Sequence, residues 1–173
     1  MSAIELPRPL VSTAGSSTLS ITILAISAFL IVTTEFLIIG LLPALARDLG
    51  ISIAAAGQLV TLFAFTVMLF GPPLTAALAH LDRKKLFIAI LLVFAFANGL
   101  AALSSNIWVL AIARFIPALM LPVFWGTASE TAAQLAGPAK SGQAIARVYL
   151  GITAALLLGI PLGTLAANGI GWR

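Results

Sequence analysis

Two ionisable residues, Glu35 and Arg114, stand inside long apolar segments and are the strongest candidates for chemistry. Burying an ionised carboxylate in hydrocarbon is costly, so we expect Glu35 to bind and release a proton as water access around it changes. The guanidinium of Arg114 stays charged and must find an acceptor, a carboxylate or water. We therefore predict a pair between Arg114 and Glu35 across a helix bundle. The alternatives are a Glu35 that only hydrogen-bonds a neighbouring helix and an Arg114 that snorkels to the membrane surface.

A few polar and aromatic side chains are candidates to line a cavity near these two groups. At 100° per residue, Arg114 and Trp125 fall close to one stripe of a helix, so the indole could offer a face for stacking or for an organic cation. We predict a substrate cavity lined by Thr34, Gln58, Thr61 and Trp125. Simple aromatic packing and helix-to-helix hydrogen bonding are the competing explanations. Glu130, near a helix end, is expected to meet loop cations such as Lys140.

The chain lacks the residues that most catalytic and metal-binding sites need. The chain has no cysteine, which removes disulfides, thiolate catalysis and cysteine metal sites. The single histidine, His80, stands beside Asp82, and one histidine with one aspartate makes an improbable metal site. No Ser–His pair or paired aspartates lie at membrane depth. We therefore expect neither an enzyme nor a bound metal or cofactor.

The composition places the candidate residues in a membrane protein. The chain has 173 residues, of which 61% are hydrophobic and 8% charged, against roughly 45–50% apolar and about 25% charged in a soluble domain. Runs long enough to cross a bilayer predict an all-α, polytopic membrane helix bundle. Its five predicted transmembrane helices are Ser20–Ala46, Ile53–Ala79, Leu86–Leu103, Ile107–Ala133 and Gln143–Ala167.

Residues that start and stop helices separate these segments. Gly50 can adopt the left-handed conformation that ends the first helix, and Ser52 can cap the second. Residues 1–19 are predicted to form a polar tail that precedes a transmembrane bundle at 20–173. Small residues recur every four positions along the last helix and predict a ridge on which another helix backbone packs closely. They are Gly151, Ala155, Gly159, Gly163 and Ala167.

The basic residues predict an orientation. Arg47 and Arg173 fall on one side of the five-helix topology, and the larger group falls on the other: Arg8, Arg83, Lys84, Lys85, Lys140 and Arg147. Cytoplasmic loops carry an excess of lysine and arginine, so the N-terminus is predicted to be cytoplasmic. The same placement accounts for the net charge of +4 without a nucleic-acid partner.

Short motifs occur in order along the chain. They are Thr34-Glu35-Phe36, Gly40-Leu41-Leu42-Pro43, Asp48-Leu49-Gly50, Ala55-Ala56-Gly57-Gln58, Gly71-Pro72-Pro73-Leu74-Thr75, Asp82-Arg83-Lys84-Lys85, Ala113-Arg114-Phe115, Gly159-Ile160-Pro161-Leu162-Gly163-Thr164 and Gly171-Trp172-Arg173. With these motifs, the chain from Thr33 to Arg173 resembles the N-terminal portion of a major facilitator superfamily transporter. The resemblance is to the bacterial drug:proton antiporter group, which includes sugar, nucleoside and drug exporters.

The resemblance implies proton-coupled efflux of a small organic solute, such as a drug, sugar or nucleoside, by alternating access in the bacterial inner membrane. It makes Arg114 the buried arginine of the fourth helix. It assigns a cytoplasmic gating loop to Asp82, Arg83, Lys84 and Lys85, and the antiporter motif to Gly159, Pro161 and Gly163.

The implied partners are the solute, protons, the lipid bilayer and a missing C-terminal half or an oligomer partner. The family has two six-helix halves, and this sequence stops before its sixth helix, so we expect an incomplete N-terminal half. The alternative is a truncated, non-transporting membrane protein or an assembly partner.

Overall fold

Long apolar segments form helices because in lipid every backbone N–H and C=O must be satisfied within the segment. The computed structural model describes residues 14–172 and contains no strand in that range. Its elements in chain order are α1 (Ala14–Leu49), α2 (Ile53–Leu78), α3 (Arg83–Ala102), α4 (Ile107–Ala136), the 3-10 turn η1 (Pro138–Lys140), α5 (Ser141–Ala154), the π-helical turn η2 (Ala155–Gly159) and α6 (Ile160–Ile170).

The predicted fold class is confirmed. Within the described residues, five helical stretches are long and apolar enough to cross a membrane. The last of them, Pro138–Ala167, runs through η1, α5, η2 and most of α6, which together form one interrupted span.

The junction between α1 and α2 follows the sequence prediction. Gly50 has a φ of 63°, the left-handed conformation that a glycine adopts without steric strain. The Ser52 hydroxyl accepts a hydrogen bond from the Ala55 N–H at 3.1 Å and caps α2. Both predictions are confirmed.

The first helix begins earlier than the sequence analysis predicted. α1 starts at Ala14 instead of Ser20, so positions 14–19 of the predicted polar tail are helical. Positions 1–13 lie outside the described residues.

The third helix also begins earlier than predicted, which corrects the description of the gating segment as a loop. The Asp82 carboxylate accepts a hydrogen bond from the Lys85 N–H at 2.9 Å and so caps α3. Arg83, Lys84 and Lys85 therefore form the first turn of α3. Positive charge is unfavourable at a helix N-terminus, and the Asp82 cap offsets that effect.

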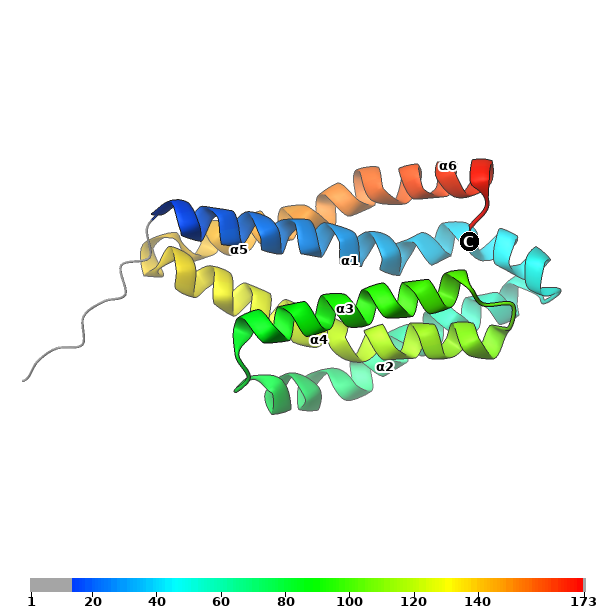
Figure 1. Ribbon diagram of the computed structural model, residues 1–173, viewed down its shortest axis with the longest axis horizontal. Helices are drawn as coiled ribbons and strands as arrows, with labels where there is room; N and C mark the ends of the chain where they lie inside the picture. Colours follow the sequence, from blue (N-terminus) through cyan, green and yellow to red (C-terminus); the bar gives the residue numbers. More distant parts are fainter. Residues whose placement is uncertain (1–13, 173) are drawn as a thin grey trace, which may run out of the picture.

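The helices pack mainly in three pairs: α1 with α5, α2 with α4, and α3 with α4. Figure 1 shows α1 running beside α5 and α6, with α2, α3 and α4 grouped on the other side. The largest fully buried side chains of the core between them include Ile31, Ile90, Val123, Phe124 and Val148.

The predicted ridge of small residues is the contact surface between α1 and the last span. A methyl group added at Gly159 would overlap the side chain of Thr33, and one added at Gly163 would lie 2.8 Å from the Leu37 Cδ1. On α1, a methyl group added at Gly40 would likewise lie 2.6 Å from the hydroxyl oxygen of Thr164. The two backbones therefore approach closely along most of their length.

The last span is interrupted beside Pro161. The Ile160 N–H donates to the carbonyl of Ala155, five positions earlier, which is the π-helical pattern. Pro161 has no N–H to donate to the preceding turn, so the regular α-helical ladder cannot pass through it. A π-helical turn next to a proline is a site at which a helix bends or flexes.

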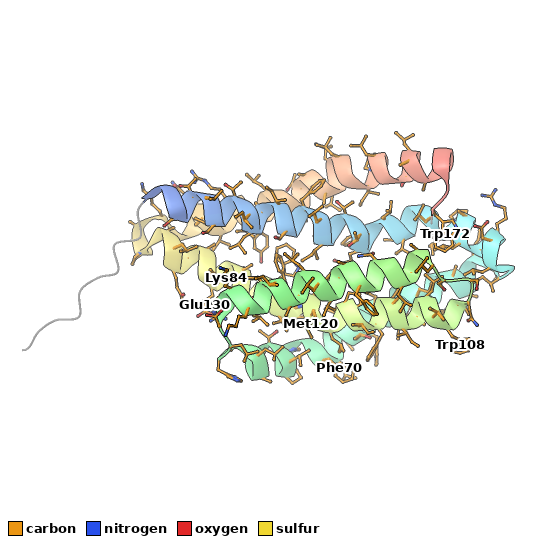
Figure 2. All side chains as sticks on the ribbon, viewed as in Figure 1. Phe70, Lys84, Trp108, Met120, Glu130 and Trp172 are labelled. Atoms are coloured by element: carbon orange, nitrogen blue, oxygen red, sulfur yellow. The ribbon has the colours of Figure 1, made fainter. Side chains whose placement is uncertain are left out.

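The outer surface of the bundle carries large apolar side chains. Leu92, Phe96 and Leu157 are 63%, 69% and 70% exposed, and Figure 2 shows side chains projecting from the outer faces of the helices. Water solvates such a surface poorly, whereas hydrocarbon does not penalise it.

Candidate functional site around Arg114

Arg114 is the buried charged residue of the described bundle, with 8% of its surface exposed. Its Nη1 donates to the Thr34 carbonyl at 3.1 Å, and its Nη2 donates to the Glu35 carbonyl at 2.6 Å. The guanidinium carbon also lies 5.0 Å from the centre of the Phe63 ring, a favourable position for a cation over an aromatic face. The buried Nε has no hydrogen-bond partner within the described chain.

These contacts join α4 to the turn of α1 that carries Glu35, but through atoms the sequence analysis did not predict. The acceptors are backbone carbonyls, and Arg114 forms no salt bridge with the Glu35 carboxylate in the described residues. A helix carbonyl has a second lone pair and can accept this bond while keeping its helical partner. The carboxylate of Glu35 therefore remains available to other groups.

Glu35 faces a pocket of about 290 Å³ between α1, α2 and α4, which we call the Glu35 pocket. The pocket is largely apolar, with Glu35 and Arg114 as its charged groups. Its lining residues are Glu35, Phe36, Ile39, Val60, Phe63, Ala64, Val67, Arg114 and Leu121. A carboxyl group on an apolar wall of this kind can respond electrostatically to whatever enters the pocket.

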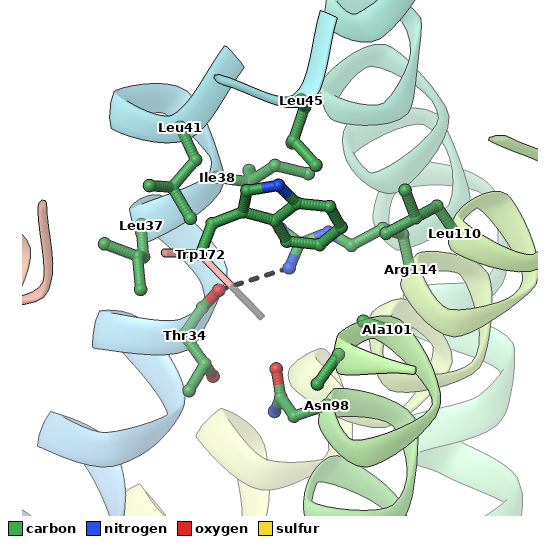
Figure 3. Close-up of a pocket in the computed structure, with 11 residues that line it drawn as sticks. Thr34, Leu37, Ile38, Leu41, Leu45, Asn98, Ala101, Leu110, Arg114 and Trp172 are labelled. Carbon is green, nitrogen blue, oxygen red and sulfur yellow. Dashed lines mark hydrogen bonds between the residues drawn. The ribbon is translucent and has the colours of Figure 1, made fainter. Parts of the chain in front are cut away.

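A second, smaller cavity of about 120 Å³ lies on another side of Arg114. Figure 3 shows Thr34, Asn98 and Trp172 around it, with the hydrogen bond from Arg114 to Thr34 drawn as a dashed line. The Trp172 indole N–H donates to the Asp48 carboxylate at 2.6 Å, across 124 positions of sequence. Arg114 lines both cavities.

The structure does not bring all the predicted cavity residues together. Thr34 lines the smaller cavity, as Arg114 does. Gln58 and Thr61 line a different hollow of about 530 Å³ between α2 and the start of α4. Trp125 packs instead against Phe124 and Tyr149, with ring centres 5.2 and 5.1 Å apart. Trp125 is therefore not among the residues that line the two cavities beside Arg114, and the aromatic ring next to the guanidinium is that of Phe63.

The predicted gating residues split into a helix cap, an ion pair and two exposed lysines. Arg83 pairs with Glu130 of α4 at 2.6 Å, whereas the sequence analysis assigned Glu130 to loop cations such as Lys140. Lys84 and Lys85 are exposed. The ion pair ties the start of α3 to the last third of α4.

We expect the Arg83–Glu130 pair to contribute little to folding. The two side chains are 27% and 49% exposed, and exposed pairs typically contribute about 0.2–1 kcal/mol. A double-mutant cycle with Arg83→Gln and Glu130→Gln should give a coupling energy below about 1 kcal/mol in thermal or denaturant unfolding of the detergent-solubilised chain. A coupling above about 3 kcal/mol would show that the pair is buried in solution.

Two of the antiporter-motif residues, Gly159 and Gly163, face α1. Gly159 and Gly163 pack on Thr33 and Leu37, and Pro161 follows the π-helical turn. They are therefore one turn from the residues Thr34 and Glu35 that Arg114 contacts.

Sequence reasoning missed three neighbours of Arg114, namely Phe63, Asn98 and Trp172. Asn98 is a lone amide in an otherwise apolar helix, and polar residues at membrane depth are rare enough to be a usable signal. Phe63 carries no such signal, because it is one of ten phenylalanines. Trp172 belongs to the Gly171-Trp172-Arg173 motif, but the motif does not show that packing of the helices brings the indole to the cavity beside Arg114.

Comparison with known proteins identifies the family of this chain. The sequence model of the Major Facilitator Superfamily matches residues 24–173. Similar proteins include the "Uncharacterized MFS-type transporter YbcL" of Bacillus subtilis (strain 168), 45% identical over 159 residues that make up 91% of this chain and 40% of that protein. The "Inner membrane transport protein YdhP" of Escherichia coli (strain K12) is 37% identical over 150 residues, 87% of this chain and 39% of that protein. The chain thus spans about 40% of the length of these relatives.

Proposed function

The chain belongs to the Major Facilitator Superfamily, and from this we propose that it forms part of a proton-coupled transporter that exports a small organic solute. Its relatives carry the names of membrane transporters. We propose for this chain the direction of transport, the coupling to protons and the class of solute. We also propose that it belongs to the drug:proton antiporter group.

The observation that carries the proposal is the contact of Arg114 with the turn of α1 that carries Glu35. A permanently charged guanidinium, 8% exposed, is fixed by two hydrogen bonds on that turn. The carboxyl group beside it opens onto the Glu35 pocket. A carboxyl group placed between a fixed cation and a solute pocket is a site at which protonation depends on whether the pocket is occupied.

We assign each group one role. Glu35 binds and releases the proton, Arg114 holds the turn of α1 and sets the local field, and the aromatic and aliphatic wall of the Glu35 pocket contacts the solute. The Arg83–Glu130 pair belongs to a gating segment at the end of the bundle that we propose faces the cytoplasm.

Alternating access requires two helical halves that rock around a site near the middle of the membrane. We therefore propose transport for the assembly of this bundle with a second half. The π-helical turn next to Pro161 is placed to flex as α5 and α6 follow α1 during that motion.

Solute-dependent proton release tests the proposal on this chain. The purified chain, in weakly buffered detergent solution with a pH-indicator dye, is titrated with sugars, nucleosides and organic cations in turn. One class should release protons in a saturable manner. Saturable binding of a solute with no proton release would contradict proton coupling. No binding by any class, with co-purification of another membrane protein, would instead favour an assembly partner.

A further inference from the structure

A polar hollow of about 440 Å³ lies at the end of the bundle where α1 begins, opposite the end that holds Trp172 (Figures 1 and 2). We call it the basic pocket. It is lined by Ser17, Thr18, Ile21, Leu135, Ala136, Lys140, Gln143, Ala144 and Arg147. None of these residues belongs to the site around Arg114.

The chain builds this pocket where α4 turns into α5. Gly137, with a φ of 74°, ends α4, and the short turn Pro138–Lys140 leads directly into α5. Spacings of three, four and seven residues place Lys140, Gln143 and Arg147 on one face of the chain as it enters α5. That face meets the first turns of α1.

The described lining of the pocket is basic and includes no acidic side chain. Within the described residues there is one salt bridge, and it joins Arg83 to Glu130. Lys140 and Arg147 therefore have no carboxylate partner in the described structure. The Gln143 amide adds a neutral donor, while Ile21 and Leu135 form an apolar wall.

The length of α1 places the pocket at the depth of lipid headgroups. Helix α1 rises about 46 Å between Ser17 and Asp48 at 1.5 Å per residue, and a bilayer including its headgroups is about 40–45 Å thick. With Asp48 in one headgroup layer, Ser17 lies in the other. Ser17 lies in a headgroup layer whichever side of the membrane the N-terminus faces.

We propose that the basic pocket binds the phosphate headgroup of an anionic phospholipid. A guanidinium and an ammonium group without carboxylate partners match the phosphodiester, because Arg147 can donate two parallel hydrogen bonds and Lys140 acts as a point charge. Gln143 donates to a further oxygen, and the apolar wall contacts the start of the acyl chains. The inference goes beyond the proposed transport function and does not depend on it.

Native mass spectrometry of the 173-residue chain tests this proposal. The detergent-solubilised protein is mixed with phosphatidylglycerol or with phosphatidylcholine at equal concentration, and the lipid-bound fraction is measured. Phosphatidylglycerol should be retained preferentially, with one molecule bound more tightly than the rest. Because a basic side chain near an anionic headgroup contributes about one kcal/mol, Lys140→Gln with Arg147→Gln should weaken binding on the order of thirtyfold.

A charge-matched variant separates a specific pocket from a general positive charge. Lys84→Gln with Lys85→Gln removes two cations from the same end of the bundle, outside the basic pocket. It should change phosphatidylglycerol binding less than about threefold. Equal losses in the two double variants would overturn the proposal, as would equal retention of the two lipids. Displacement of phosphatidylglycerol by an equal concentration of inorganic phosphate would assign the pocket to a soluble anion and overturn the lipid proposal.

Discussion

Replacing Gly151 with alanine is expected to force α5 away from α1 and to destabilise the bundle by about 3 kcal/mol, the upper end of overpacking effects. The added methyl group would lie 2.9 Å from both the Ala28 Cβ and the Phe29 backbone nitrogen, and closer still to the Ala25 carbonyl oxygen. These atoms belong to the α1 backbone or are directly attached to it. No side-chain rotation can relieve the overlap, so one helix must move.

Gly142 provides a matched control in the same helix. An added methyl group there meets no atom within 4 Å, and alanine is a better helix former than glycine by about 1 kcal/mol. Gly142→Ala should therefore leave the thermal unfolding temperature unchanged or raise it, as followed by far-UV circular dichroism in detergent. If Gly151→Ala unfolds at the same temperature as Gly142→Ala, the close approach of α1 and α5 is not present in solution.

The helices were predictable because length and apolarity decide whether a segment spans a bilayer. Ile53 and Ile107 begin helices as predicted, since Ser52 and Asn106 before them are polar capping residues. The start of α3 was predicted at Leu86 instead of Arg83, because Asp82 was not recognised as a capping residue. The π-helical turn lies beside Pro161, where Gly159 packs on α1. The sequence predicted close helix packing at Gly159 but not that the partner helix is α1.

The candidate site was predictable in its residues but not in its contacts. A lone glutamate and a lone arginine in apolar helices must find polar surroundings, and the structure places them on one pocket. The choice of the Thr34 and Glu35 carbonyls as acceptors depends on how α1 and α4 are rotated about their axes. Hydrophobic patterns do not fix that rotation in helices that are apolar all round.

Trp125 shows that two residues on one face of a helix need not line the same cavity. It falls near the stripe of Arg114 but lies about 16 Å farther along the helix axis. At that level its neighbours are Phe124 and Tyr149, so it packs near α5 and away from the Glu35 pocket. Gln58 and Thr61 line one hollow together, but that hollow lies against the start of α4.

Replacing Glu35 with glutamine is expected to abolish solute-linked proton release while leaving the fold intact. Glutamine has nearly the size and shape of glutamic acid and keeps hydrogen-bonding groups at the same place, but it cannot release a proton. The hydrogen bond from Arg114 to residue 35 involves the backbone carbonyl and survives the substitution. The Glu35 pocket keeps its apolar wall, so the solute should still bind.

Glu130→Gln is the matched control, since it removes an exposed carboxylate that pairs with Arg83 at the end of the bundle. The decisive measurement is the number of protons released per bound solute, with binding measured in the same samples by equilibrium dialysis. Our account predicts wild-type release from the Glu130→Gln variant and no release from Glu35→Gln, although both bind the solute. Undiminished proton release from a solute-bound Glu35→Gln chain would contradict it.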